Sequence, residues 1–288
     1  MIQSAAHKSI FINIMEKLKT KAGAYFENNA MRYKEDHYLR NKFHPKWVRH
    51  KKILELIKEF EPMVNSNILD IGCGPGFLAL DLAKIGYGGT GMDTSKKMIE
   101  LSSSLFNDSN ISNWNFKIGD AENTGFKDEE FDCIIASGVI EYMNEDFKML
   151  MEMNRILKPN GYLIINVTNK LGYSTSLNMI TNTIKKIPYV MRILSVIRKY
   201  ILDAEYGADN LGFTPRKHFL FKFQKSLKDT GFTIRKNIHH DFSIFPAPFS
   251  TLTQKILGKV DHKLDFLGST PLKIFCASNL ICAQKNES

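Results

Sequence analysis

The sequence predicts an α/β protein with a doubly wound, mainly parallel sheet. Short apolar runs typical of buried strands alternate with stretches whose apolar residues recur at helical spacing. A glycine-rich turn, "DIGCGPG" at 70–76, joins the first of these runs to a helical stretch. Because strands that alternate with helices build right-handed βαβ units, we expect a mainly parallel sheet.

Two helices are predicted ahead of the alternating region, at 7–21 and 46–60. In the first, residues such as Ile10, Ile14 and Leu18 share one face, and the second has its own apolar face. The predicted strands that follow are 67–71, 88–93, 114–120, 131–140, 161–167, 231–240 and 273–285. The predicted helices among them are 77–86, 95–106, 144–157 and 215–229.

Composition sets limits on the class of protein. With 288 residues and 43% hydrophobic content, the chain can form one large domain with insertions. No apolar run approaches the roughly 18 residues that span a bilayer. The apolar N-terminal segment is interrupted by Asn13 and Glu16, so we do not expect a signal peptide. The net charge of +9 only weakly suggests an anionic partner or surface.

Four cysteines are scattered along the chain without a C-x-x-C pair, which excludes a zinc ribbon or a dithiol redox motif. We expect reduced, buried thiols and a cytoplasmic protein. The cysteines are Cys73, Cys133, Cys276 and Cys282.

Two insertions, 170–212 and 241–272, interrupt the alternation. The first contains a predicted helix, 188–202, with an apolar face. Basic residues, without any acid, accompany it. Such a helix can lie on an anionic membrane surface, or it can be a lid packed on a cleft, and the sequence leaves both interpretations open. The basic residues are Lys185, Lys186, Arg192, Arg198 and Lys199.

The glycine-rich turn indicates a ligand that touches the backbone. Gly72, Gly74 and Gly76 allow close approach at the N-terminus of a helix. Asp93 ends the next strand, where an acid commonly binds ribose hydroxyls. A dinucleotide fingerprint would need glycine at Phe77, so a nicotinamide-dependent oxidoreductase is a distant alternative.

The turn resembles the first motif of class I S-adenosylmethionine-dependent methyltransferases. Further similarities follow in order: "GMD" at 91–93, "GDAEN" at 119–123, "FDCIIASGVIEYM" at 131–143 and "RILKPNGYLIINV" at 155–167. The resemblance implies a Rossmann-like sheet of seven strands with the last antiparallel, plus helical lid insertions. It also implies N-terminal helices at 1–60 covering the cofactor cleft, and a methyltransferase domain at 61–288.

The same resemblance implies how S-adenosyl-L-methionine would bind. Asp70 would approach its ammonium group, Asp93 both ribose hydroxyls, and Asp120 the adenine amino group. Cys73 is expected as a small residue of the loop, not as a nucleophile. The cofactor-binding residues implied in full are Asp70, Gly72, Cys73, Gly74, Gly76, Asp93, Thr94, Met98, Asp120, Ala121, Ser137, Gly138 and Tyr33.

A general base is less evident. Members of the family that this sequence resembles often have Glu-His after the fourth strand, but Glu141 is followed by Tyr142 here. The candidates elsewhere are His218, His239 and His240, although adjacent strand residues face opposite ways. No cluster has metal-ligand spacing, so we expect no metal requirement.

These observations predict a methyltransferase (EC 2.1.1.-), acting on oxygen of a small or lipid-linked acceptor such as a sugar, phenol or quinone precursor. The alternatives are N- or C-methylation of a small metabolite, and a catalytically silent cofactor-binding partner subunit. The sequence "SGVI" replaces the Asn/Asp-Pro-Pro-aromatic motif of nucleic-acid amino-methylating enzymes, which argues against nucleic acid. The segment 185–202 is the candidate for peripheral membrane contact.

Overall fold

The computed structural model describes residues 2–35, 45–60, 66–172, 213–241 and 267–287. The predicted helix 188–202 and most of the two insertions lie outside these residues.

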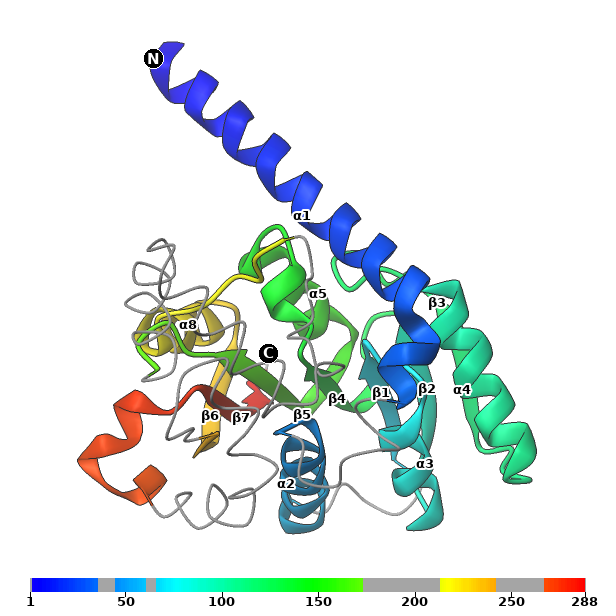
Figure 1. Cartoon of the computed structure of the whole chain (residues 1–288). Coiled ribbons are helices and arrows are strands. Elements are labelled where there is room, and N and C mark those ends of the chain that lie inside the picture. The colour runs from blue at the N-terminus through cyan, green and yellow to red at the C-terminus, as the bar shows by residue number, and fades with distance from the viewer. Residues whose placement is uncertain (1, 36–44, 61–65, 173–212, 242–266, 288) are drawn as a thin grey trace, which may run out of the picture.

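Seven strands form one sheet in the order β3-β2-β1-β4-β5-β7-β6 (Figure 1). The β1 to β5 pairs are parallel, whereas β7 runs antiparallel to both of its neighbours. This confirms the predicted fold class. The strands are β1 Asn67–Ile71, β2 Gly88–Asp93, β3 Trp114–Ile118, β4 Phe131–Ser137, β5 Leu157–Thr168, β6 Phe232–His240 and β7 Ser278–Lys285.

Helices cover both faces of the sheet because alternate strand residues point to opposite sides. In β4, Ile134 packs with the apolar faces of α5 and α8, while Ile135 packs with those of α2 and α3. The helices are α1 Ile2–Lys34, α2 Pro45–Phe60, α3 Phe77–Lys84, α4 Lys96–Asp108, α5 Asp146–Ile156 and α8 Leu220–Asp229, with 3₁₀ turns η2 Ile140–Tyr142 and η4 Pro271–Phe275.

Several predicted boundaries were wrong. The strand expected at 131–140 ends at Ser137, because Gly138 has a positive φ of 79° and the chain turns into η2. The last strand begins at Ser278 and not at 273, because Thr270 caps a 3₁₀ turn that starts with Pro271. With these boundaries, Ser137 at the end of β4 and Ser278 at the start of the antiparallel β7 both lie at the carboxyl edge of the sheet.

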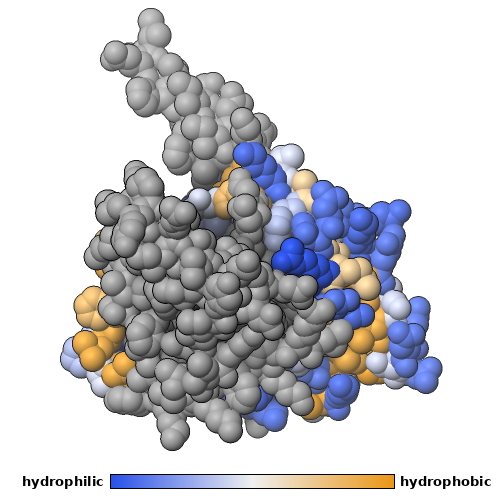
Figure 2. Space-filling view, in the orientation of Figure 1, coloured by the Kyte–Doolittle hydropathy of each residue, from blue (hydrophilic) through white to orange (hydrophobic). Residues whose placement is uncertain are grey.

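The helix α1 is much longer than the predicted 7–21. Its C-terminal half lies against the sheet side of the molecule, in contact with α4 and η2, and its N-terminal half extends away from the sheet (Figure 1). In the same orientation, the surface over α4 and β3 is mainly hydrophilic (Figure 2). Within the described residues, no helix has both the length and the apolarity that a membrane crossing needs.

Candidate active site

The glycine-rich turn follows β1 in a conformation that side chains would disrupt. Gly72 has a φ of 69°, and a Cβ there would lie 2.4 Å from Cγ2 of Val139. Gly76 has a φ of 82°, and its Cβ would lie 2.8 Å from Cβ of Ser102. Packing therefore explains both glycines before any ligand is considered.

Asp93 connects this turn to α4. One carboxylate oxygen accepts a hydrogen bond from the Gly74 amide at 3.0 Å, and the other accepts from the Ser95 amide at 2.9 Å. Burial raises the pKa of Asp93, and these amide hydrogen bonds oppose that shift. The carboxylate lines a cavity of about 310 Å³, a size typical of small-molecule sites.

Asp70 lies in a smaller cavity of about 40 Å³ that shares walls with the larger one. Its side chain is 2% exposed. Burial, and then the nearby charge of Asp93, raise the pKa of Asp70 to about 8. Arg49 of α2 lines both cavities, and its guanidinium would lie 3.1 Å from a Cβ on Gly138. Cations from α2 thus face the carboxyl end of β1 and β4.

The helix α1 contributes a wall to the larger cavity. Lys19 donates hydrogen bonds to both oxygens of Asp120 at 2.6 Å and to Glu122 at 2.7 Å. Although burial lowers it, the pKa of Lys19 is raised on balance by these two carboxylates. Glu27 accepts from the Ser95 hydroxyl at 2.7 Å and the Lys97 amide at 3.1 Å. The same helix therefore contacts both the end of β3 and the start of α4.

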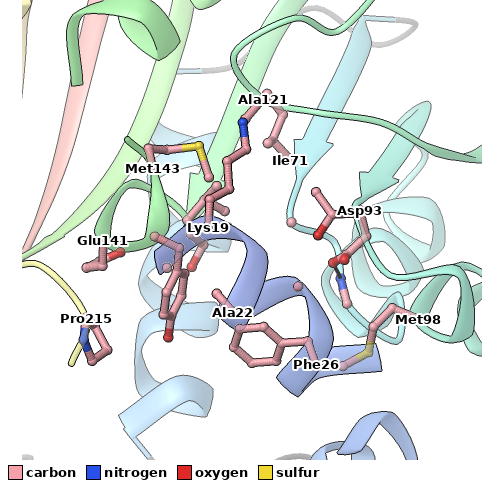
Figure 3. Close-up of a pocket in the computed structure, with 18 of the residues that line it drawn as sticks. Lys19, Ala22, Phe26, Ile71, Asp93, Met98, Ala121, Glu141, Met143 and Pro215 are labelled. Atoms are coloured by element: carbon pink, nitrogen blue, oxygen red, sulfur yellow. Dashed lines mark hydrogen bonds between the residues drawn. The ribbon is translucent and has the colours of Figure 1, made fainter. Parts of the chain in front are cut away.

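At the other end of the cavity lies Glu141 of η2, opposite Asp93 (Figure 3). One of its oxygens accepts from the Thr168 amide at 3.0 Å and from the Thr168 hydroxyl at 2.7 Å. Tyr142 and Met143 also line this end, together with Pro215, Arg216 and Lys217. Among the described residues, no group of three or more His, Cys, Asp or Glu could hold a metal ion.

The structure does not place the three candidate histidines among the residues that line either cavity. His218 lies 3.1 Å from Asp146, just before α8 and not within a helix as expected. His240 lies 3.0 Å from Asn166, and burial, followed by the charges of Arg49 and Lys52, lowers its pKa to about 3. Burial also lowers the pKa of His239, beside Cys276. A catalytic role for them stays a prediction that the geometry does not favour.

Most of the residues expected at the cofactor meet at these cavities. Asp120, paired with Lys19, and Gly76, packed on α4, line neither of them. Asp70 and Cys73 line only the smaller one. The larger cavity is lined by Gly72, Gly74, Asp93, Thr94, Met98, Ala121, Ser137, Gly138 and Tyr33.

Sequence reasoning missed three charged residues of this site. Arg49 precedes the apolar positions Ile53, Leu56 and Ile57 on the buried side of α2, and a cation at that spacing was a usable signal. Lys19 had no such signal, because its partners are about 100 residues away. Glu141 was visible in the sequence, but only as the neighbour of a missing histidine.

Comparison with known proteins gives the class. Residues 69–165, from β1 to β5, match the family model described as methyltransferase domain. The fold, the glycine-rich turn and this match define a class I S-adenosylmethionine-dependent methyltransferase domain, and the chain carries one.

Curated relatives share only part of their length with the chain. The ubiquinone biosynthesis O-methyltransferase of Pelagibacter ubique is 31% identical over 134 residues, which cover 44% of this chain and 55% of that protein. The demethylmenaquinone methyltransferase of Staphylococcus haemolyticus is 28% identical over 53% of this chain and 62% of its own length. The chain thus spans about half the length of the relatives it matches.

Solved structures agree on the fold. The YcgJ protein of Bacillus subtilis superposes with a TM-score of 0.55 at 19% identity, covering 83% of this chain and all of that one. The [4+2]-cyclase SpnF gives a TM-score of 0.54 at 20% identity, covering 82% and 81%. Since one of these is named a cyclase, the fold alone does not fix the reaction.

Proposed function

We propose that the chain binds S-adenosyl-L-methionine and transfers its methyl group to an oxygen of a small or lipid-linked acceptor. The observation that supports this most is one cavity with a carboxylate at each end. Asp93, at one end, ends β2, where an acid commonly binds ribose hydroxyls, and Glu141 lies at the other end. The ubiquinone and menaquinone names among the relatives favour a phenol or quinone precursor over a sugar.

The residues present fit the cofactor. Asp93 would accept from the ribose hydroxyls, since hydroxyls donate and a carboxylate accepts. The Ala121 backbone would face the adenine ring, and Met98 would pack on it. Arg49 and Asp70 would meet the carboxylate and the ammonium group of the methionine part.

When bound, the cofactor supplies a methyl group already activated by its sulfonium. The chain must therefore align the acceptor and keep water out. Phe26 and Tyr142, whose ring centroids lie 5.4 Å apart, bring α1 and η2 together at the cavity. We infer that this aromatic contact covers the reacting atoms.

Methyl transfer can be tested with labelled S-adenosylmethionine and a panel of phenols, sugars and amines. We expect label in the ether product of a phenol. Label only in amines or at carbon would favour the N- or C-methylation alternative. Binding of S-adenosylhomocysteine without any transfer would favour a silent partner subunit, and no binding of either compound would overturn the proposal.

Membrane contact through 185–202 belongs to the same proposal, because lipid-tailed acceptors lie in membranes. Each exposed cation near an anionic surface contributes about 1 kcal/mol. Changing Arg192, Arg198 and Lys199 to Gln should therefore release the protein from anionic vesicles in co-sedimentation, with cofactor affinity unchanged. Absence of binding by the parent protein would contradict this part.

A further inference from the structure

Glu141 has one carboxylate oxygen that no described group satisfies. The side chain is 4% exposed and follows β4 in the turn η2. Oxygen Oε1 accepts both hydrogen bonds from Thr168, at 3.0 and 2.7 Å, while Oε2 is buried without a hydrogen-bond partner. The two oxygens of one carboxylate are thus used very differently.

An unpaired buried oxygen is costly to maintain. A buried polar atom that loses its hydrogen-bond partner destabilises the folded state, and the cost is larger when the atom is charged. The described residues hold eight such side-chain atoms, and Glu141 is the one among them that lines the larger cavity. Here Thr168 fixes the carboxylate in place without satisfying it, so folding alone does not account for the orientation.

The position of Glu141 indicates what could satisfy it. Glu141 lines the cavity at the end away from Asp93 and Met98 (Figure 3). The proposed cofactor contacts with the ribose and the adenine, through Asp93 and Met98, lie at the opposite end. The Glu141 end is therefore left for the acceptor.

The surroundings of Glu141 suit a flat ring. Tyr142 presents an aromatic ring that Phe26 contacts from α1, and Met143 presents a thioether, which packs well on aromatic groups. A phenol offers such a ring together with an O–H donor, whereas an aryl ether offers the ring alone. An ionised carboxylate only accepts hydrogen bonds, so it can bind the O–H of the phenol but has no hydrogen bond to offer the ether oxygen.

We propose that Oε2 of Glu141 accepts a hydrogen bond from a phenolic hydroxyl of the acceptor and so selects hydroxylated rings over their ethers. This inference rests on the proposed function, because it assigns the acceptor end of the same site. An aryl ether leaves Oε2 unpaired, so the methylated product is held less tightly than the substrate.

The test compares Glu141→Gln with the parent protein. Glutamine keeps an oxygen for the two Thr168 hydrogen bonds and replaces Oε2 with an NH₂ donor. Glu145→Gln, four residues away and exposed, removes the same charge and serves as the matched control. Catechol and 1,2-dimethoxybenzene are the probes, titrated calorimetrically into the complex with S-adenosylhomocysteine.

The parent and Glu145→Gln should bind catechol at least tenfold more tightly than the dimethoxy compound. In Glu141→Gln this preference should fall at least tenfold, with affinity for S-adenosylhomocysteine within twofold of the parent. An unchanged preference, or a parent complex that does not bind catechol, overturns the assignment of Glu141. A parent that fails to bind S-adenosylhomocysteine overturns the proposed function instead.

Discussion

At the scale of single residues, the ionisation of Asp70 makes the stability of the fold depend on pH. Its folded pKa of about 8 lies above the ordinary value of 3.8, so the folded state binds the proton more tightly than the unfolded state does. Stability contributed by this group is therefore complete below pH 3.8 and is lost as pH rises towards 8. Asp70→Asn should raise the free energy of unfolding at pH 7.5, by up to about 5 kcal/mol, since each pH unit above 3.8 contributes roughly 1.4 kcal/mol.

Urea unfolding at pH 7.5 and at pH 3.5 measures this difference. The gain in the variant should nearly disappear at the lower pH, because the parent carboxyl is then protonated in both states. Equal stabilisation at the two values would mean that Asp70 is not the titrating group.

Asp93 gives the second prediction at this scale. Asp93→Ala should weaken S-adenosylhomocysteine binding by about 1–3 kcal/mol, through loss of the ribose contacts. The side chain also joins Gly74 to Ser95, so a weaker affinity alone could reflect a displaced loop. An analogue without the two ribose hydroxyls separates these effects. The parent should prefer the natural ligand, and the variant should bind both equally.

At the scale of elements, α1 is held over the site by polar contacts at two points. Lys19 contacts Asp120 and Glu122, and Glu27 contacts the start of α4. Lys19→Gln should weaken the docking of α1 by about 1 kcal/mol, because a charged hydrogen-bonded pair is lost. That value corresponds to about fivefold faster release of S-adenosylhomocysteine.

Stopped-flow release of the ligand measures this effect. Lys21→Gln is the control, since Lys21 is exposed on the same helix and loses the same charge. Slower release in Lys19→Gln would instead mean that Asp120, freed from Lys19, binds the adenine amino group more strongly. Equal rates in the two variants would exclude a role for Lys19 in covering the site.

The elements themselves were largely predictable, since periodicity and the glycine turn depend on local sequence. The seven strands, with the last antiparallel, followed from the resemblance, and the Asp93 end of the site followed from the turn. The length of α1 was not predictable, because its second half is held by contacts with α4, η2 and the segment after β3. Lys19 and Arg49 reach the site only through tertiary packing, which no local pattern records.

At the scale of the whole molecule, the cavity is bordered by residues from α1, the β1 turn, β2 and the β5 edge. A ligand that contacts all of them binds the folded state alone and stabilises the chain as a unit. At a concentration 100 times Kd, such a ligand adds about 2.7 kcal/mol. For a chain of this size, roughly 2–4 °C of Tm accompanies each kcal/mol, so S-adenosylhomocysteine should raise Tm by about 5–10 °C.

Differential scanning calorimetry with S-adenosylhomocysteine and with NADH checks this prediction. NADH should leave Tm unchanged, because Phe77 stands where a dinucleotide-binding turn needs its third glycine. A larger shift with NADH would favour an oxidoreductase. A shift with S-adenosylhomocysteine that survives Asp93→Ala at full size would show that the ligand stabilises the fold without using the Asp93 end of the cavity.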